Sequence, residues 1–218
     1  MLVNGKRRKT KRPIDNHKIA LRKAYDGKAQ ERELTDPAPW KAALRQSFLD
    51  RLQQTGAKTL LELGAGSGKD SKFFQDQGLD VTCVDLSPEL VKLCQQKGLN
   101  AQVCDFTELD YAPNSFDAVY ALNSLLHISK AELPAILENI RTILSPSGLF
   151  YMGVWGGPSS EKIWAQDSYD PPRFFSFYPD DKIQALLSSY FKIHTFERLE
   201  NLQPDDRIHM QSIVMGQR

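Results

Sequence analysis

The stretch that most constrains the fold of this chain is Thr59–Asp70, which reads TLLELGAGSGKD. An apolar run that carries one acid, Glu62, enters a glycine-rich turn at residues 64–68, and a helix-compatible segment follows at 69–77. Glycine reaches positive φ angles and lets the backbone approach a ligand closely. A buried strand, a glycine turn and a helix start are the parts of a nucleotide-binding βα unit.

The composition indicates a single globular domain with a basic N-terminal arm. The chain has 218 residues, of which 41% are hydrophobic and 25% charged, with a formal net charge of +1. Six positive charges fall within residues 6–12, before the first acid, so the rest of the chain is net negative. We expect residues 1–13 to be a disordered basic arm, either simply solvated or in contact with a nucleic acid or another acidic partner.

The three cysteines, Cys83, Cys94 and Cys104, form no CxxC pair. This number and spacing exclude a disulfide scaffold and a zinc knuckle, predict no metal site and suit a reducing compartment. No apolar run approaches the ~20 residues that span a bilayer, and residues 1–12 lack the apolar block of a secretory signal. We therefore expect no membrane contact and a cytoplasmic location.

Periodicity predicts helices followed by a strand–helix alternation. Residues 14–56 are expected to form N-terminal helices, one at 15–33 that Gly27 interrupts and one at 40–54 that Gly56 ends. Within 57–154, four further short strands are expected at 80–84, 101–104, 116–121 and 149–154, with helices between them. This alternation is typical of a doubly wound, mostly parallel sheet with helices on both faces.

The pattern changes after residue 154. Residues 155–180 are predicted to be an irregular segment rich in aromatic residues that serves as a substrate lid. Residues 181–218 are predicted to hold a helix at 181–190 and two strands, at 191–198 and 209–215, in an antiparallel hairpin. The sheet would then have seven strands within a single domain, residues 14–218.

This order resembles the class I S-adenosylmethionine-dependent methyltransferases over roughly residues 40–215. The matching motifs are an acid before a GxGxG turn (Glu62, Gly64, Gly66, Gly68), acids at the ends of the second and third strands (Asp85, Asp105-Phe106), an FDAV strand (Phe116–Val119), and the turn Leu144, Pro146, Gly148, where Ser147 replaces the usual glycine. The resemblance implies a Rossmann-like α/β/α sandwich, S-adenosylmethionine as cofactor, and a methyltransferase of class EC 2.1.1.-.

The resemblance also implies roles for single residues. Asp85 would accept hydrogen bonds from the ribose hydroxyls, each worth ~1.5–3 kcal/mol, and Asp105 would accept from the adenine amino group. Glu62 would face the amino group of the methionine part. The predicted cofactor set is Glu62, Gly64, Ala65, Gly66, Gly68, Asp85, Leu86, Asp105, Phe106 and Leu122.

Residues for the acceptor are expected after the fourth strand and in the lid. His127 is the candidate general base, because imidazole titrates near neutrality; the alternative is a histidine that only packs near the cofactor. The predicted substrate residues are Tyr25, Trp40, Trp155, Arg173 and Tyr178, with core packing as the alternative. Arg173 would grip a carboxylate or phosphate.

Particular residues bear on other possible functions. A nicotinamide-dependent dehydrogenase is disfavoured, because Lys69 occupies the position where its GxGxxG/A turn needs a small residue. Asp170-Pro171-Pro172 resembles a motif of adenine amino-group methyltransferases, but it follows the fifth strand instead of the fourth. We expect a small-molecule acceptor methylated on oxygen or nitrogen. An RNA or tRNA methyltransferase that uses residues 6–12, or a non-catalytic cofactor-binding protein, stays open, as does a monomer or homodimer.

Overall fold

The computed structural model describes residues 16–218, so the predicted basic arm lies outside the described residues. Two helices come first, α1 (Asn16–Leu34) and α2 (Pro39–Thr55), and Gly56 ends the second in a left-handed conformation. The predicted break at Gly27 is wrong, since α1 runs through it without interruption. Glycine inside a helix costs only ~1 kcal/mol, and burial of Ala24 and Ala29 on either side outweighs that cost.

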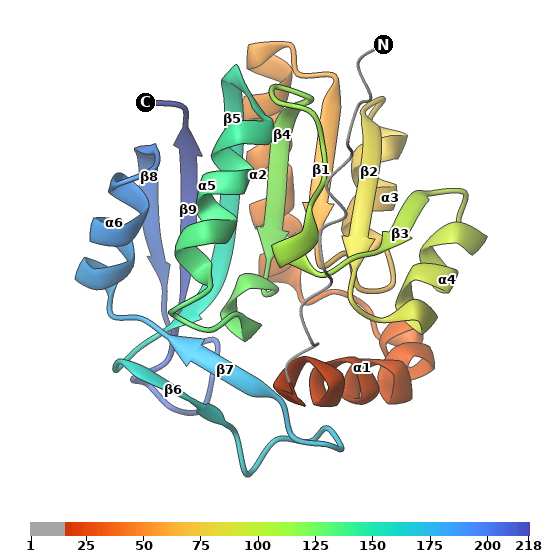
Figure 1. Ribbon diagram of the computed structural model, residues 1–218, viewed down its shortest axis with the longest axis vertical. Helices are drawn as coiled ribbons and strands as arrows, with labels where there is room; N and C mark the ends of the chain where they lie inside the picture. The colour runs from red at the N-terminus through yellow and green to blue at the C-terminus, as the bar shows by residue number, and fades with distance from the viewer. Residues whose placement is uncertain (1–15) are drawn as a thin grey trace, which may run out of the picture.

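A seven-stranded sheet forms the centre of the molecule, in the spatial order β3-β2-β1-β4-β5-β9-β8 (Figure 1). The neighbours from β3 to β5 pair in parallel, whereas β9 pairs antiparallel with both β5 and β8. This arrangement confirms the predicted mostly parallel sheet with a terminal antiparallel hairpin. The strands are β1 (Thr59–Leu63), β2 (Asp80–Asp85), β3 (Asn100–Val103), β4 (Phe116–Leu122), β5 (Leu144–Gly156), β8 (Lys192–Leu199) and β9 (His209–Gly216).

Helices cover both faces of this sheet, with α5 in front of it and α2 behind it in Figure 1. Strand β1 shows why the sheet has two cores: successive side chains point to opposite faces. Leu61 and Leu63 join the core beneath α5, and Leu60 joins the core that contains Phe48 of α2 and Phe74 of α3. The remaining helices are α3 (Lys69–Asp76), α4 (Pro88–Gln96), α5 (Leu133–Ile143) and α6 (Asp180–Ser188), with short 3-10 turns η1 (Phe106–Glu108) and η2 (Leu125–His127).

Local capping fixes where the helices begin. The hydroxyl of Ser87 accepts a hydrogen bond from the backbone N–H of Leu90 and so caps α4. The hydroxyl of Ser129 accepts the backbone N–H of Glu132 and donates to its carboxylate, and α5 begins immediately after Glu132 with Pro134 in its first turn. The connections at the carboxyl ends of the strands are therefore held in defined positions.

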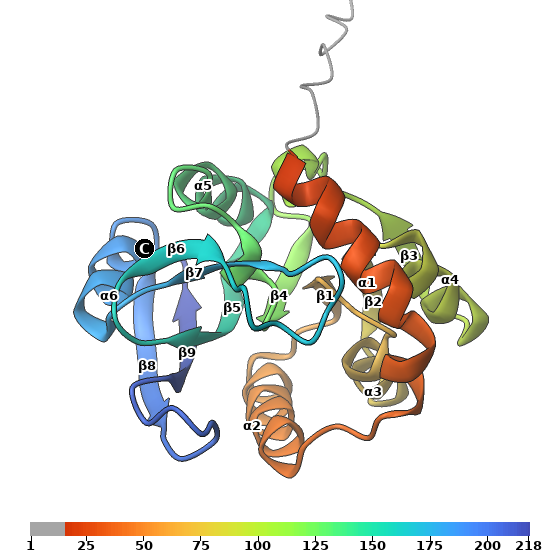
Figure 2. The ribbon, with the colours of Figure 1, turned by 90° about the horizontal axis from the view of Figure 1, so that it is seen from below.

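The segment predicted to be irregular, 155–180, contains an antiparallel strand pair outside the main sheet. Strands β6 (Ser160–Ile163) and β7 (Phe174–Phe177) form it, and the expectation of an irregular segment is wrong over these residues. The rings of Phe175 and Phe177 stack 5.9 Å apart, with Trp164 packed against both. Viewed from below, this pair and α1 lie on the same side of the molecule, beneath the lower ends of the parallel strands (Figure 2).

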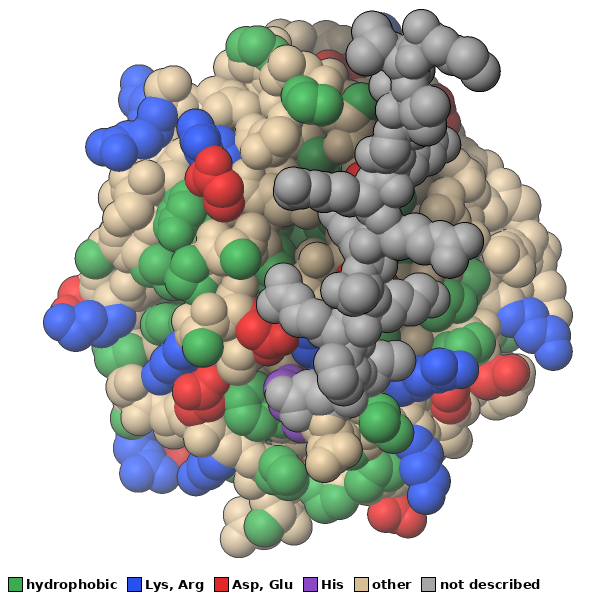
Figure 3. All heavy atoms as spheres, in the orientation of Figure 1, with side chains coloured by type: hydrophobic (Ala, Val, Ile, Leu, Met, Phe, Trp, Pro, Cys, Tyr) green, Lys and Arg blue, Asp and Glu red, His purple; other side chains and the backbone are tan. Residues whose placement is uncertain are grey.

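The visible surface in Figure 3 carries basic and acidic side chains interspersed around its periphery. Among residues 16–218, no helix has the length and apolar character that crossing a membrane requires.

Candidate functional site

A cavity of about 550 Å³ lies where the carboxyl ends of β1, β2 and β4 meet α1. This size falls within the range of small-molecule sites, and the place is where open parallel sheets bind ligands. Nine of the ten predicted cofactor residues line it, Gly68 being the exception. The wall also contains residues of α1 and of the 155–180 segment, which close the cavity from below.

The glycine turn forms one wall of the cavity. Its backbone has positive φ angles and close neighbours, both of which favour glycine. Gly64 has a φ of +77°, and a Cβ there would lie 2.4 Å from Cβ of Ser124. Gly66 has a φ of +57°, and its N–H donates to Asp85 across 2.9 Å. Gly68 has a packing role, because a Cβ there would lie 2.8 Å from Sγ of Cys94.

Asp85 ends β2 and is buried at the cavity wall. Its Oδ1 accepts the N–H of Ser87 and its Oδ2 accepts that of Gly66, both at 2.9 Å. Burial nevertheless raises the pKa of this carboxyl to about 6, and the two backbone donors only partly oppose that effect. Each carboxylate oxygen retains a further lone pair, so Asp85 can accept additional hydrogen bonds from a ligand.

Glu62 is a second buried acid beside the glycine turn. The hydroxyl of Ser71 donates to it, and Asp70 lies nearby, where Arg45 holds it through an ion pair of 2.8 Å. Burial, followed by the charge of Asp70, raises the pKa of Glu62 well above its ordinary value. A cationic group placed beside Glu62 would favour its ionised form.

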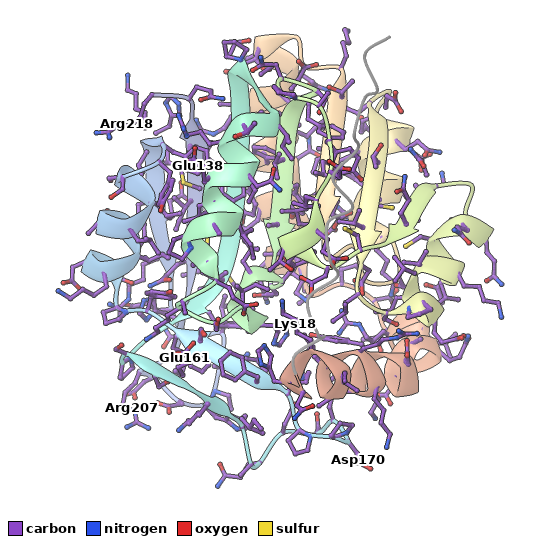
Figure 4. The ribbon with its side chains drawn as sticks, in the orientation of Figure 1. Lys18, Glu138, Glu161, Asp170, Arg207 and Arg218 are labelled. Carbon is purple, nitrogen blue, oxygen red and sulfur yellow. The ribbon has the colours of Figure 1, made fainter. Side chains whose placement is uncertain are left out.

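Asp105 is already engaged by the protein. It caps η1 through the N–H of Thr107 at 2.9 Å, and Nζ of Lys18 lies 3.0 Å from its Oδ2. The same ammonium lies 2.7 Å from Glu132, so Lys18 joins α1 to two acids at the edge of the sheet. Figure 4 shows Lys18 between α1 and the lower ends of the strands. The predicted contact of Asp105 with adenine stays a prediction.

His127 is buried and both of its ring nitrogens are bonded. Nδ1 lies 2.7 Å from the carbonyl oxygen of Phe174, which can only accept, so Nδ1 carries the proton. Nε2 therefore accepts from the hydroxyl of Tyr25, at 2.7 Å. Burial lowers the pKa of His127 to about 3, opposed by the Phe174 carbonyl and assisted by the charge of Arg173. The imidazole is thus neutral at neutral pH.

Arg173 contributes to the lower wall of the cavity. It pairs with Asp167 through two bonds of 2.8 Å, and its NH1 donates to the Tyr25 hydroxyl at 3.0 Å. Its guanidinium lies 3.6 Å from the ring centroid of Tyr169, which places a flat cation over an aromatic face. Three of its five guanidinium N–H groups bond to Asp167 and Tyr25, so Arg173 positions Tyr25 in addition to lining the cavity.

Only some of the other predicted substrate residues lie at the cavity. Tyr25 and Trp155 line the cavity, whereas Trp40 and Tyr178 lie outside its lining. Trp40 packs edge-on against Trp155 with ring centroids 5.6 Å apart, and the ammonium of Lys130 lies 4.8 Å from the ring of Tyr178.

Several cavity residues were missed by the sequence reading. A polar helix reads as solvated, so only Tyr25 of α1 was expected at the cavity and the charged residues of its inner face were not. No group of histidine, cysteine, aspartate and glutamate within residues 16–218 is arranged to hold a metal ion. The missed lining residues are Lys18, Arg32, Lys41, Lys69, Asp70 and Tyr169, whereas Asn123 and Ser124, after the fourth strand, and Phe175, in the lid, lie in segments where the acceptor was expected.

The fold is that of a Rossmann-like α/β protein with a cavity at the carboxyl ends of its parallel strands. Residues 61–152 match the family model described as a methyltransferase domain. Residues 61–152 therefore belong to the methyltransferase domain family, in a chain that has the class I S-adenosylmethionine-dependent methyltransferase fold.

Curated relatives include both N- and O-methyltransferases. Phosphoethanolamine N-methyltransferase 1 of Triticum aestivum is 28% identical over 127 residues, which cover 53% of this chain and 25% of that protein. Ubiquinone biosynthesis O-methyltransferase of Xanthomonas oryzae pv. oryzae is 32% identical over 113 residues, covering 47% and 44%. The chain thus spans less than half the length of these relatives.

A solved structure resembles nearly the whole chain. It is Burkholderia thailandensis 1,6-didemethyltoxoflavin-N1-methyltransferase, with bound 1,6-didemethyltoxoflavin and S-adenosylhomocysteine. The two chains share 23% identity and a TM-score of 0.71 over 95% of this chain and 93% of that one. At this identity the likeness shows the fold.

Proposed function

We propose that this protein is an S-adenosylmethionine-dependent methyltransferase that acts on an oxygen or nitrogen of a small molecule. One observation carries the proposal: nine residues chosen as cofactor ligands from motifs far apart in the sequence line a single cavity. The methyltransferase domain match at residues 61–152 supports the same reaction class.

The residues present fit the cofactor. Asp85 offers buried carboxylate lone pairs for the ribose hydroxyls, and Leu86 and Phe106 offer apolar surface for the base. Three buried polar atoms of this cavity have no hydrogen-bond partner among residues 16–218: Nε of Arg32, Oδ1 of Asn123 and Oγ of Ser124. Buried polar groups are normally bonded, so these atoms indicate a polar ligand.

When bound, this cofactor supplies a methyl group attached to a sulfonium sulfur, and the rest of the cofactor is the leaving group, a neutral thioether. The protein then has to orient the acceptor and exclude water. The hydroxyl of Tyr25 gives its proton to His127 and accepts from Arg173, so one lone pair remains for an N–H or O–H of the acceptor. In this proposal Tyr25 touches the acceptor, and His127 acts through Tyr25 by fixing its hydroxyl.

The lower wall favours a small acceptor. Helix α1 and the 155–180 segment cover the cavity, whose volume of about 550 Å³ must hold cofactor and acceptor together. Rings of Tyr25, Trp155, Tyr169 and Phe175 supply flat apolar contacts within it. The curated relatives act on oxygen in one case and nitrogen in another, so both atoms remain within the proposal.

Methyl transfer from labelled S-adenosylmethionine tests the proposal. The full chain is incubated with panels of phenols, heteroaromatic N–H compounds and amines, and labelled product is measured. We expect turnover of at least one acceptor class and its loss in the Asp85→Ala variant. Absence of transfer to every class would contradict the proposal.

A further inference from the structure

The lower wall of the cavity holds hydrogen bonds of fixed direction. We call it the acceptor wall, and it consists of Tyr25, His127, Tyr169, Arg173 and Phe175. Tyr25 donates its only hydroxyl proton to Nε2 of His127, and NH1 of Arg173 donates to the Tyr25 oxygen at 3.0 Å. The basic nitrogen of His127 is therefore occupied, and the oxygen of Tyr25 keeps one lone pair that faces no proton of the protein.

The charges around this pair oppose the uptake of a proton. Burial lowers the pKa of His127 to about 3, and the charges of Arg173 and Arg32 act in the same direction. Asp167 acts in the opposite direction, but it is paired with Arg173 at 2.8 Å. Burial also raises the pKa of Tyr25, so its hydroxyl stays protonated at neutral pH. Neither member of the pair can then serve as a general base.

The carboxylates that line the cavity lie elsewhere on its wall. They belong to Glu31, Asp36, Glu62, Asp70, Asp85 and Asp105. The third, fourth and fifth lie beside the glycine turn, where the cofactor is proposed to bind, and Asp105 is held by Lys18. Glu31 is exposed and pairs with Lys28, and Asp36 is exposed in the connection between α1 and α2. Within residues 16–218, none of the six bonds to a side chain of the acceptor wall.

An acceptor bound at this wall must therefore keep its proton while it attacks. A neutral hydroxyl becomes a good nucleophile only as it loses its proton, and a positioned base contributes ~10²–10⁴-fold to such steps. An amine or heteroaromatic nitrogen has a lone pair while it is neutral, so it needs no base. The lone pair of Tyr25 suits such a compound, because it accepts an N–H and repels an oxygen anion.

We propose that the acceptor is a neutral nitrogen nucleophile that donates an N–H to Tyr25 and keeps this hydrogen while it is methylated. The inference rests on the proposed function and narrows its acceptor atom to nitrogen. The nitrogen lone pair forms the new N–C bond as the C–S bond breaks, and the electrons of the C–S bond stay on sulfur. The product carries the positive charge that the sulfonium lost, and it releases a proton to water after it leaves the cavity.

The first test uses matched acceptors that differ in one atom, aniline with phenol and 5-aminoindole with 5-hydroxyindole. They are added to the acceptor panels described above, with labelled S-adenosylmethionine at neutral pH, where arylamines are neutral. We expect each amine to exceed its hydroxyl partner in kcat/KM at least about 100-fold, the contribution of the missing base. Asp85→Ala should lower the labelled product, which ties the transfer to this cavity.

The outcomes separate the inference from the proposed function. A hydroxyl compound that is methylated on oxygen as fast as its amine partner is methylated on nitrogen would overturn the inference and leave the proposed function standing. Absence of transfer to every compound would remove both.

A binding measurement tests the contact with Tyr25 without turnover. The nitrogen compound with the highest kcat/KM is titrated by calorimetry into the complex with S-adenosylhomocysteine, beside its N-methylated neutral derivative that has no N–H. We expect the wild type to prefer the N–H compound by about 2- to 10-fold, the range of one hydrogen bond, and Tyr25→Phe to lose that preference. Tyr190→Phe, whose ring packs against the core, should keep it. The same preference in wild type and Tyr25→Phe, with both folded by circular dichroism, would overturn the inference.

Discussion

The hydroxyl of Tyr25 in α1 lies 2.7 Å from Nε2 of His127 in η2, the turn that follows β4. One hydrogen bond thus joins the helix that covers the cavity to the edge of the sheet. Because His127 donates through Nδ1 to a carbonyl, the bond has a fixed direction, from tyrosine to histidine. The oxygen of Tyr25 is consequently presented as an acceptor with Arg173 at its side.

Removing that hydroxyl is expected to affect turnover and spare cofactor binding. We expect Tyr25→Phe to lower kcat by about 10²-fold, the lower range for a positioned proton-bonding group, with S-adenosylhomocysteine affinity kept within about twofold. Tyr190→Phe is the control, because its half-buried ring packs against the core away from the cavity. Equal kcat in wild type and Tyr25→Phe would contradict the role.

Cofactor affinity is expected to depend on pH through Asp85. Its pKa of about 6 means that below pH 6 the carboxyl of the free protein is protonated. A ligand that needs the ionised form must then displace a proton, so its affinity falls as pH falls, approaching tenfold per unit well below 6. Calorimetry from pH 8 to pH 5 measures this. An unchanged dissociation constant over that range would argue against the carboxylate as the ribose acceptor.

The glycine turn offers a stability test that separates strain from overpacking. Gly68→Ala places a methyl group 2.6 Å from Cδ1 of Leu99, at a φ of +82°. Gly78→Ala has a similar φ of +89° and nothing within 4 Å. We expect left-handed strain to lower the free energy of unfolding by ~1–2 kcal/mol in both variants. Overpacking should lower it by about 1–3 kcal/mol more in Gly68→Ala. Urea unfolding of the two variants measures the difference, and equal losses would show that the packing here can yield.

Much of the fold was predictable because its signals are local. Short apolar strands that end in acids, a glycine turn and good N-caps such as Ser87 each specify their structure within a few residues. The positions of Glu62, Asp85 and Asp105 followed from that order, since the carboxyl ends of neighbouring parallel strands share one edge.

The features that the sequence did not predict depend on tertiary contacts. Gly27 reads as a helix break, yet the buried face of α1 keeps the helix continuous. Lys18 and Arg32 read as solvated charges, and only the folded chain places them against acids and the glycine turn. Strand β6, Ser-Glu-Lys-Ile, has little strand signal of its own and pairs with β7 because the chain turns back beneath the sheet.

The ion pairs of Lys18 are expected to dock α1. In Lys18→Met the two carboxylates of Asp105 and Glu132 lose their shared cation in a partly buried place. We expect a loss of about 1–3 kcal/mol in the free energy of unfolding, the cost of leaving buried polar groups unpaired. Lys28→Met on the same helix removes an exposed pair with Glu31 and should change little. Equal stabilities of the two variants in urea would show that α1 does not depend on Lys18.

Calorimetric titration of the full chain with S-adenosylhomocysteine at pH 8 tests the central claim most directly, that the cavity at the ends of β1, β2 and β4 holds this nucleoside. The account predicts one site per chain and a loss of about 10- to 100-fold in affinity for Asp85→Ala, whose fold should remain intact. Absence of binding to the wild type, or equal affinity of the two proteins, would contradict it.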